Sequence, residues 1–247
     1  MSNPDDYNLG LEPPLEDPFD QLELAAPPPP DPEAMLALLN SAEPSQRMTA
    51  ARVFCDLQDS RAAPLLLNLL TDVCPLIRVS AAYALGRNVS PLAVEPLIQA
   101  LQSDWNGYVR KGLVWALGNC GDRRAFAPLL QALKTDISAV RLWAASSLAS
   151  IAKLAYEDVI AAIPPLIEAL RRDRIAAVRS NCAWSIGQLC RELPSNVVYA
   201  TAIDALLEAL VEDPDLGVKE DAKAALLRLG DPRGLQMIED LELEGFI

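Results

Sequence analysis

The stretch Asp104–Gly118 reads DWNGYVRKGLVWALG, and its pattern recurs along most of the chain. An aspartate comes six residues before an arginine, an apolar run follows, and a leucine–glycine pair closes the segment. The aspartates in the same place of successive copies are Asp72, Asp104, Asp136, Asp173 and Asp213. Copies that recur at a period of roughly 30–40 residues are typical of a solenoid of stacked helix pairs. We therefore predict an all-α repeat protein.

Each repeat is predicted to contain two helices joined by a short turn. The first helix opens with a proline or a small residue followed by leucine, as in Pro96-Leu97, because the first amide of a helix has no partner within that helix. The second helix carries the cation, and positions −1, +3 and +7 from it are apolar and face the core. A degenerate repeat around Arg47 brings the array to about six helix pairs. We predict that these pairs stack into a right-handed superhelix, an α-solenoid.

The ends of the array differ from its middle. Repeat six has Glu220, Asp221 and Lys223 where the inner repeats have small or apolar residues, as expected for a capping repeat. A closing helix is predicted over Gly234–Glu244. The longer links that precede repeats five and six predict an extra turn on the second helices of repeats four and five.

Charge is unevenly distributed along the 247 residues, whose net charge is −13. Residues 1–33 contain nine acids and no base, residues 34–203 contain 13 acids and 17 bases, and residues 204–247 contain 12 acids and four bases. A mildly basic middle between two acidic ends argues against nucleic-acid binding, which needs a strong basic field. It is compatible with an anionic ligand or an acidic protein partner over the central repeats.

The amino-terminal segment has a composition of its own. Positions 1–32 include nine prolines, with Pro27–Pro30 in a row, and show no helical or strand period. We predict a disordered tail over 1–32 and the solenoid over 33–247. The tail is either a solubilising extension or a docking segment in which Phe19, Leu22 and Leu24 of the sequence DPFDQLEL enter a groove, and it could fold back onto the basic middle.

The chain has no histidine, which removes the usual general base, the serine and cysteine triads, and most zinc and iron sites. Five cysteines at irregular spacing indicate reduced thiols, and no apolar run approaches the ~20 residues of a membrane span. Cys182 falls at a core position, whereas Cys74 lies in a turn and is the thiol expected to be exposed. We predict a cytoplasmic protein with no metal, no cofactor and no catalytic constellation.

The combination of D…VR…AA.ALG with a preceding P-L-L..L is similar to HEAT repeats, and it more narrowly resembles the HEAT-like repeats of the phycobilisome bilin lyase family. The resemblance covers about residues 59–230. It implies that the paired aspartates and arginines form a structural ladder of hydrogen bonds that ties each turn to a neighbouring repeat. The ladder residues are Asp72, Arg78, Asp104, Arg110, Asp136, Arg141, Asp173 and Arg179, and Asp213 with Lys219 forms a weaker last rung.

The resemblance is specific for the repeat but spans several functions. Bilin lyase subunits work as heterodimers on antenna proteins, and other members are non-enzymatic scaffolds. A third branch, the deoxyhypusine hydroxylases, is excluded because its iron ligands resemble paired His-Glu motifs and this chain lacks histidine. The resemblance implies a protein partner: an A-type iron–sulphur carrier, a phycobiliprotein, or a second HEAT-repeat lyase subunit.

The candidate binding surface is a stripe on the second helices, which line the concave side in HEAT arrays. Position +5 from the cation points about 160° away from the core position +7. It holds Tyr83, Trp115 and Trp184 in three repeats and Arg52, Ser146 and Ala224 in the others. Polar and aromatic residues at neighbouring outward positions complete the predicted partner-binding set: Arg87, Lys111, Asn119, Trp143, Asn181 and Gln188. Such a composition is typical of interface hot spots. Alternatively, these aromatics only cover the adjacent helices. Trp105 and Tyr108 either extend the surface to one edge or pack within their turn.

Two functions follow from these observations. The first is a non-catalytic scaffold whose concave groove binds one protein in iron–sulphur cluster handling or pigment-protein assembly. The alternative is a bilin lyase subunit in which the groove holds a phycocyanobilin-type tetrapyrrole. In that case Arg87, Lys111 or Arg110 would pair with the propionates, aromatic side chains would stack on the rings, and Asp104 would handle protons.

Overall fold

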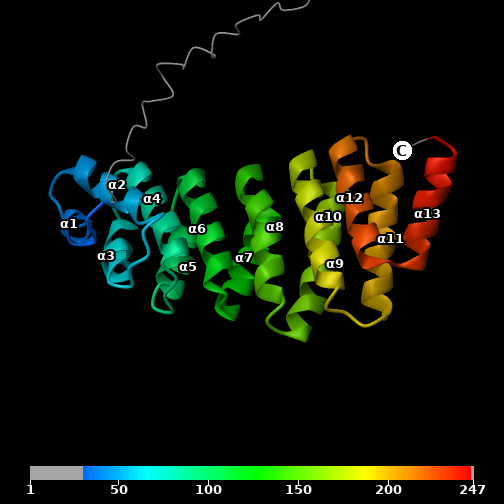
Figure 1. The fold of residues 1–247 in the computed structure, drawn as a ribbon, viewed down its shortest axis with the longest axis horizontal. Helices are drawn as coiled ribbons and strands as arrows, with labels where there is room; N and C mark the ends of the chain where they lie inside the picture. The colour runs from blue at the N-terminus through cyan, green and yellow to red at the C-terminus, as the bar shows by residue number, and fades with distance from the viewer. Residues whose placement is uncertain (1–29, 246–247) are drawn as a thin grey trace, which may run out of the picture. The chain divides into compact units, whose positions relative to one another are not determined.

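The computed structural model describes residues 30–245, and within them it forms thirteen α-helices and no strand (Figure 1). The predictions for residues 1–29 lie outside this range. The all-α prediction is confirmed. The helices are α1 Pro32–Leu38, α2 Pro44–Val53, α3 Ala62–Leu69, α4 Pro75–Arg87, α5 Val94–Ser103, α6 Gly107–Cys120, α7 Phe126–Thr135, α8 Ser138–Ala152, α9 Tyr156–Arg172, α10 Ala176–Cys190, α11 Val197–Glu212, α12 Leu216–Leu229 and α13 Pro232–Leu243.

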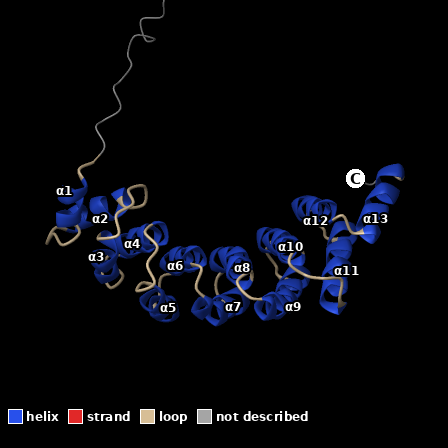
Figure 2. Cartoon of the chain, turned by 60° about the horizontal axis from the view of Figure 1, so that its bottom comes forward, coloured by secondary structure: helices blue, strands red, loops and turns tan. Residues whose placement is uncertain are grey.

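Six helix pairs, α1/α2 to α11/α12, stack side by side, and α13 follows them at the carboxyl end (Figure 1). Within this stack each second helix packs against the second helix of the next repeat as well as against its own partner, and the first helices pack on one another in the same way from α5 onward. Figure 2 shows two layers in an arc, with the second helices α4, α6, α8, α10 and α12 along the inner side. The predicted α-solenoid is therefore confirmed, and the second helices provide its concave surface.

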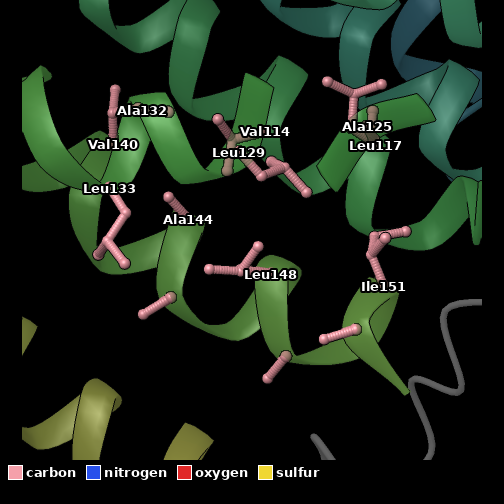
Figure 3. Packing of buried hydrophobic residues seen from close by; sticks show 14 of the residues in the cluster. Val114, Leu117, Ala125, Leu129, Ala132, Leu133, Val140, Ala144, Leu148 and Ile151 are labelled. Carbon is pink, nitrogen blue, oxygen red and sulfur yellow. The ribbon is translucent and has the colours of Figure 1, made fainter. Parts of the chain in front are cut away.

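The core follows the predicted positions. In α6 the residues at −1, +3 and +7 from Arg110 are Val109, Leu113 and Leu117, and all three are buried, as are their equivalents in α4, α8, α10 and α12. In the degenerate first repeat, Gln46 at position −1 is exposed. Figure 3 shows the packing where repeats three and four meet, with Leu117, Leu129 and Leu148 among its members. Each core layer is shared by two repeats, so no repeat buries its apolar face alone.

Small residues set the spacing between second helices. A Cβ added to Gly86 of α4 would lie 2.6 Å from the Trp115 ring and 2.9 Å from the Cα of Ala116 in α6. At Gly187 of α10 the added Cβ would lie 2.8 Å from the Cβ of Ala225 in α12. Glycine at these positions lets neighbouring helices approach more closely than a side chain would allow.

Two predictions about helix boundaries are wrong. Proline was expected at the first helical position, but Pro96 is the third residue of α5, still within the turn whose amides lack intrahelical partners. The extra length lies in the first helices α9 and α11, with 17 and 16 residues, and not in a longer second helix. Pro164 and Pro165 therefore fall inside α9. Burial of Val159 and Ile163 offsets the roughly 3 kcal/mol cost of interrupting a helix there.

Candidate functional site

The ladder joins each repeat to the next through an arginine–aspartate ion pair, which engages both carboxylate oxygens in every pair except Arg47–Asp72. Arg78 donates from Nε and Nη2 to Asp104 at 2.7 and 3.0 Å, and its Nη1 donates to the backbone carbonyl of Asp72 at 2.9 Å. Each arginine therefore holds its own turn through a carbonyl and the following turn through a carboxylate. The pairs are Arg47–Asp72, Arg78–Asp104, Arg110–Asp136, Arg141–Asp173 and Arg179–Asp213.

The last position departs from this pattern. Lys219 donates to the Val211 carbonyl at 2.7 Å and reaches no carboxylate among the described residues. A single ammonium cannot make the forked contact of a guanidinium, so the last turn is held more weakly.

The ladder carboxylates have a structural role, because their oxygens are engaged in hydrogen bonds and ion pairs. Burial raises the pKa of Asp104, but hydrogen bonds from Arg78 and from the Asn106 amide outweigh it and leave the pKa below its ordinary value. The pKa values of Asp173 and Asp213 are lowered against burial in the same way. Asp104 is thus ionised at neutral pH and has its oxygens bonded, which removes it as a proton donor.

On the concave surface, the predicted residues of α4 and α6 form one cluster. The rings of Tyr83 and Trp115 lie 5.3 Å apart at an interplanar angle of 53°, and the Arg87 guanidinium lies 5.8 Å from the Trp115 ring centroid. Both rings are half-buried, and the Trp115 indole lies against Gly86. Trp115 therefore covers α4 and presents only part of its ring to solvent. Asn119 donates to the Gly86 carbonyl at 3.3 Å, so it also connects the two helices.

A second cluster extends from α6 to α10. The Lys111 ammonium lies 5.7 Å from the Trp143 ring centroid, and Asn181 donates to the Leu142 carbonyl at 2.7 Å. Trp143, Asn181 and Trp184 border an open hollow of about 500 Å³. Trp184 is 36% exposed. The hollow is also lined by Leu142, Ser146, Ala177, Ser180 and Asp221.

The predicted stripe is thus divided between two clusters rather than being one uniform row. Gln188 lies beyond the hollow, where its amide oxygen accepts from Lys153 at 3.3 Å. Indole and phenol faces beside cations and amides can bind a peptide through apolar contact, cation–π contact and hydrogen bonds. Of the predicted aromatics, Trp184 is the one whose side chain is committed least to its neighbours.

A further surface carries residues whose role the sequence left open or did not indicate. The turns between paired helices, together with the first turn of the helix after each, hold large apolar side chains that point into solvent: Val73 is 90% exposed, Trp105 76%, Tyr108 70% and Leu76 59%. For Trp105 and Tyr108 the sequence allows either exposure at a binding surface or packing within the turn. It gives no prediction for Val73 and Leu76. Their position beside the ladder aspartate is the signal that could have identified them. We name the edge formed by these turns the turn edge.

The cysteines offer little reactivity. Cys182 is buried in the core as predicted, and burial raises its pKa. Burial also raises the pKa of Cys120 to about 11 and of Cys190 to about 12, which keeps both as thiols near neutral pH. Cys74 is half-buried. Within residues 30–245 no three histidine, cysteine or carboxylate side chains come together as metal ligands. No helix in this range is long and apolar enough to cross a bilayer.

The geometry defines an all-α repeat solenoid with an aromatic concave surface. The family description "HEAT repeats" matches residues 32–111, 94–187 and 163–244, so the chain belongs to the HEAT-repeat proteins. No curated protein matches the sequence.

Several solved structures share the fold. The complex of CpcE and CpcF of phycocyanin lyase from Nostoc sp. PCC7120 is 24% identical, with a TM-score of 0.58 over 87% of this chain and 83% of that one. A designed armadillo repeat protein in complex with the peptide (KR)4 is 22% identical, with a TM-score of 0.61 over 80% and 98%. A mutant of Kap121p is 17% identical, with a TM-score of 0.66 over 85% of this chain and 24% of that one.

Proposed function

We propose that the protein is a non-catalytic scaffold that binds a segment of a partner protein on its concave surface. The observation that carries the proposal is the hollow between α8, α10 and α12, where Trp143 and Trp184 are accessible beside Asn181. Tryptophan is enriched among the hot spots of protein interfaces. A related fold that binds a peptide, the armadillo design with (KR)4, supports this use of the solenoid.

The finer identification rests on the family resemblance. We propose a cytoplasmic adaptor, without a cofactor, in iron–sulphur cluster assembly or in phycobilisome biogenesis. Its partner would be an A-type iron–sulphur carrier, a phycobiliprotein or a second HEAT-repeat subunit. The pairing of two such subunits in the CpcE–CpcF complex supports the last of these.

The test is a pull-down from a photosynthetic cell extract with the full chain as bait. Trp184→Ala removes the most exposed indole of the concave surface, whereas Trp115→Ala also uncovers α4 and is less suitable alone. Leu92→Ala, at a residue 77% exposed on the opposite edge from the turns, is the matched control. We expect one partner to be lost with Trp184→Ala and kept with Leu92→Ala. Titration of that purified partner should show at least ~2 kcal/mol of lost binding free energy.

If Trp184→Ala and Trp143→Ala both retain every partner at unchanged helicity, the concave surface is not the binding site. Thermal melts of each variant separate a lost contact from a lost fold.

A second candidate is a bilin lyase subunit. It is favoured by the likeness to CpcE and CpcF and by the cations beside concave aromatics, Arg87 at Trp115 and Lys111 at Trp143. Proton handling by Asp104 and propionate binding by Arg110 do not fit this candidate, because both groups are occupied in the ladder. Mixing the protein with phycocyanobilin, alone and with a second HEAT-repeat subunit, tests this candidate. An unchanged visible absorption spectrum in both cases would dismiss it.

A further inference from the structure

The turn edge differs from the concave surface in how freely its large side chains meet solvent. Val73, Leu76, Trp105 and Tyr108 are all at least 59% exposed. Val73 and Trp105 lie on the successive turns α3–α4 and α5–α6, and Leu76 and Tyr108 lie in the first turn of the helix that follows each of them. Monomeric proteins rarely expose several large apolar residues together, and such patches usually mark interaction sites.

The patch is also rigidly supported. The Arg78 guanidinium lies 5.7 Å from the Trp105 ring centroid and is itself held by Asp104. Asp104 accepts the Asn106 amide at 2.8 Å, and the Asn106 side chain caps α6 by accepting from Tyr108 and Val109. An exposed indole on a fixed turn loses little conformational entropy when a partner covers it.

A basic hollow lies further along the same edge. A hollow of about 600 Å³ lies between the carboxyl ends of α7 and α9. Its charged lining is the cations Lys134, Arg141, Arg172 and Arg174 and the carboxylates Asp136, Glu168 and Asp173, so the cations are in excess. Lys134 and Arg174 make no ion pair among residues 30–245, and Arg172 is 3.7 Å from Glu168 in an exposed contact. The carboxyl ends of the two helices contribute partial negative charge, which the amino ends of α8 and α10 offset. The side-chain cations without an ion-pair partner therefore make the electrostatic potential of this hollow positive.

The neighbouring hollows lack this excess of positive charge. The hollow between α5 and α7 has Gln102, Gln131 and Thr135 beside its ladder pair. In the hollow between α9 and α11, Arg171 pairs with Glu208, and Glu212 adds a further negative charge. An anionic group is thus attracted to one place on the edge, between the α9–α10 turn and the α7–α8 turn, the latter of which adjoins the Trp105 patch.

We propose that the turn edge is a second docking surface, which binds an acidic segment of a protein partner: bulky apolar side chains rest on Val73, Leu76, Trp105 and Tyr108, and carboxylates enter the hollow at Lys134, Arg172 and Arg174. A flat anionic bilayer would also find aromatics and cations here. It is disfavoured because these cations line a concavity, which a carboxylate side chain can enter, and because the net charge of −13 opposes an anionic membrane.

The test is a selection of displayed random peptides on the immobilised full chain, followed by titration of each enriched peptide. We expect the enriched peptides to combine Asp or Glu with Trp, Phe or Leu. Trp105→Ala with Tyr108→Ala should weaken their binding at least about tenfold, and so should Lys134→Glu with Arg174→Glu. The second effect should shrink at high salt, because the cations act through solvent. Leu92→Ala on the opposite edge should leave affinity unchanged.

Three outcomes would overturn the proposal. One is enrichment of peptides whose binding is lost in Trp184→Ala and kept in both edge variants, which would assign them to the concave surface. Another is the absence of any acidic preference or of any enriched peptide. The third is sedimentation of the protein with phosphatidylserine vesicles, lost in Trp105→Ala with Tyr108→Ala, when no peptide is enriched. Melting curves identify any variant that fails to fold.

Discussion

The concave surface and the turn edge hold their large side chains in different ways. On the concave surface Tyr83 and Trp115 stack on each other, and Trp115 also covers Gly86, so these rings stabilise the helix stack as well as facing solvent. On the turn edge Trp105 and Tyr108 stand out from the fold. An aromatic side chain at an outward helical position can therefore both pack against the neighbouring helix and remain available to a partner. At the turn edge, the same kind of side chain contributes little to the packing of the fold.

The largest expected effect comes from the ladder that supports the turn edge. Arg78→Ala leaves the carboxylate of Asp104 buried without its guanidinium partner, and we expect a loss of about 3–5 kcal/mol in the free energy of unfolding. Arg123→Ala, which breaks an exposed pair with Asp158, is the control and should cost under about 1 kcal/mol. Urea denaturation measures both. Equal costs would mean that the ladder contributes no more than a surface ion pair.

The close approach under the concave surface is tested by Gly86→Ala. Alanine is the better helix former by about 0.5–1 kcal/mol, but its Cβ would overlap Trp115 and the Ala116 backbone. We expect a net loss of about 1–2 kcal/mol, part of which is recovered when Trp115→Ala is added. Gly217→Ala, where the nearest atom is a side-chain oxygen at 3.2 Å, should be near neutral. A Gly86→Ala variant as stable as wild type would show that α4 and α6 can shift apart freely.

Removing one tryptophan from each surface compares them directly. Trp115→Ala should cost about 2 kcal/mol, because a half-buried indole and its contact with α4 are lost. Trp105→Ala should cost under about 1 kcal/mol, since it gives up mainly the contact with Arg78. Thermal denaturation of the two variants checks the difference. If Trp105→Ala proved more destabilising than Trp115→Ala, the difference described between the two surfaces would be wrong.

The smallest change per residue is expected from pH. The folded pKa values of Asp104, Asp173 and Asp213 lie below their ordinary values, so these carboxylates stabilise the fold above the unfolded pKa of about 3.9. That contribution is lost as pH falls below about 4 and through the lower folded values. We expect the free energy of unfolding to fall over this range, and Asp104→Asn to reduce the slope. A stability that does not change below about pH 4 would contradict the lowered pKa values of the ladder.

The repeat pattern predicted the core because burial in a solenoid is periodic. The spacing from each cation identified Val109, Leu113 and Leu117 without any structure, and the helix count followed from the same spacing. The first residue of α9 could not be derived, because Pro164 and Pro165 resemble a helix start and the burial that carries the helix through them is tertiary.

The candidate sites were less predictable than the fold. An outward position could be assigned for Trp115, but its contact with Gly86 depends on the preceding repeat. Trp105 could equally have folded over its turn, and the Arg78 contact that holds it outward also arises from the previous repeat. Lys134 and Arg174 belong to different repeats and meet at one hollow only because two turns are adjacent in space. Each case needs distances between repeats, which a single repeat does not contain.

The ladder also determines along which edge the solenoid can change its length when it bends. Each arginine binds its own turn and the next one, so the turn edge behaves as a spine of nearly constant length. The opposite edge is joined by contacts of varied kinds, such as Arg123–Asp158 and the Asn88 side chain on the Phe54 carbonyl. Bending of the stack should therefore open or close the opposite edge and pivot on the spine. A partner that flexes the arc would leave the spacing of turns along that spine unchanged.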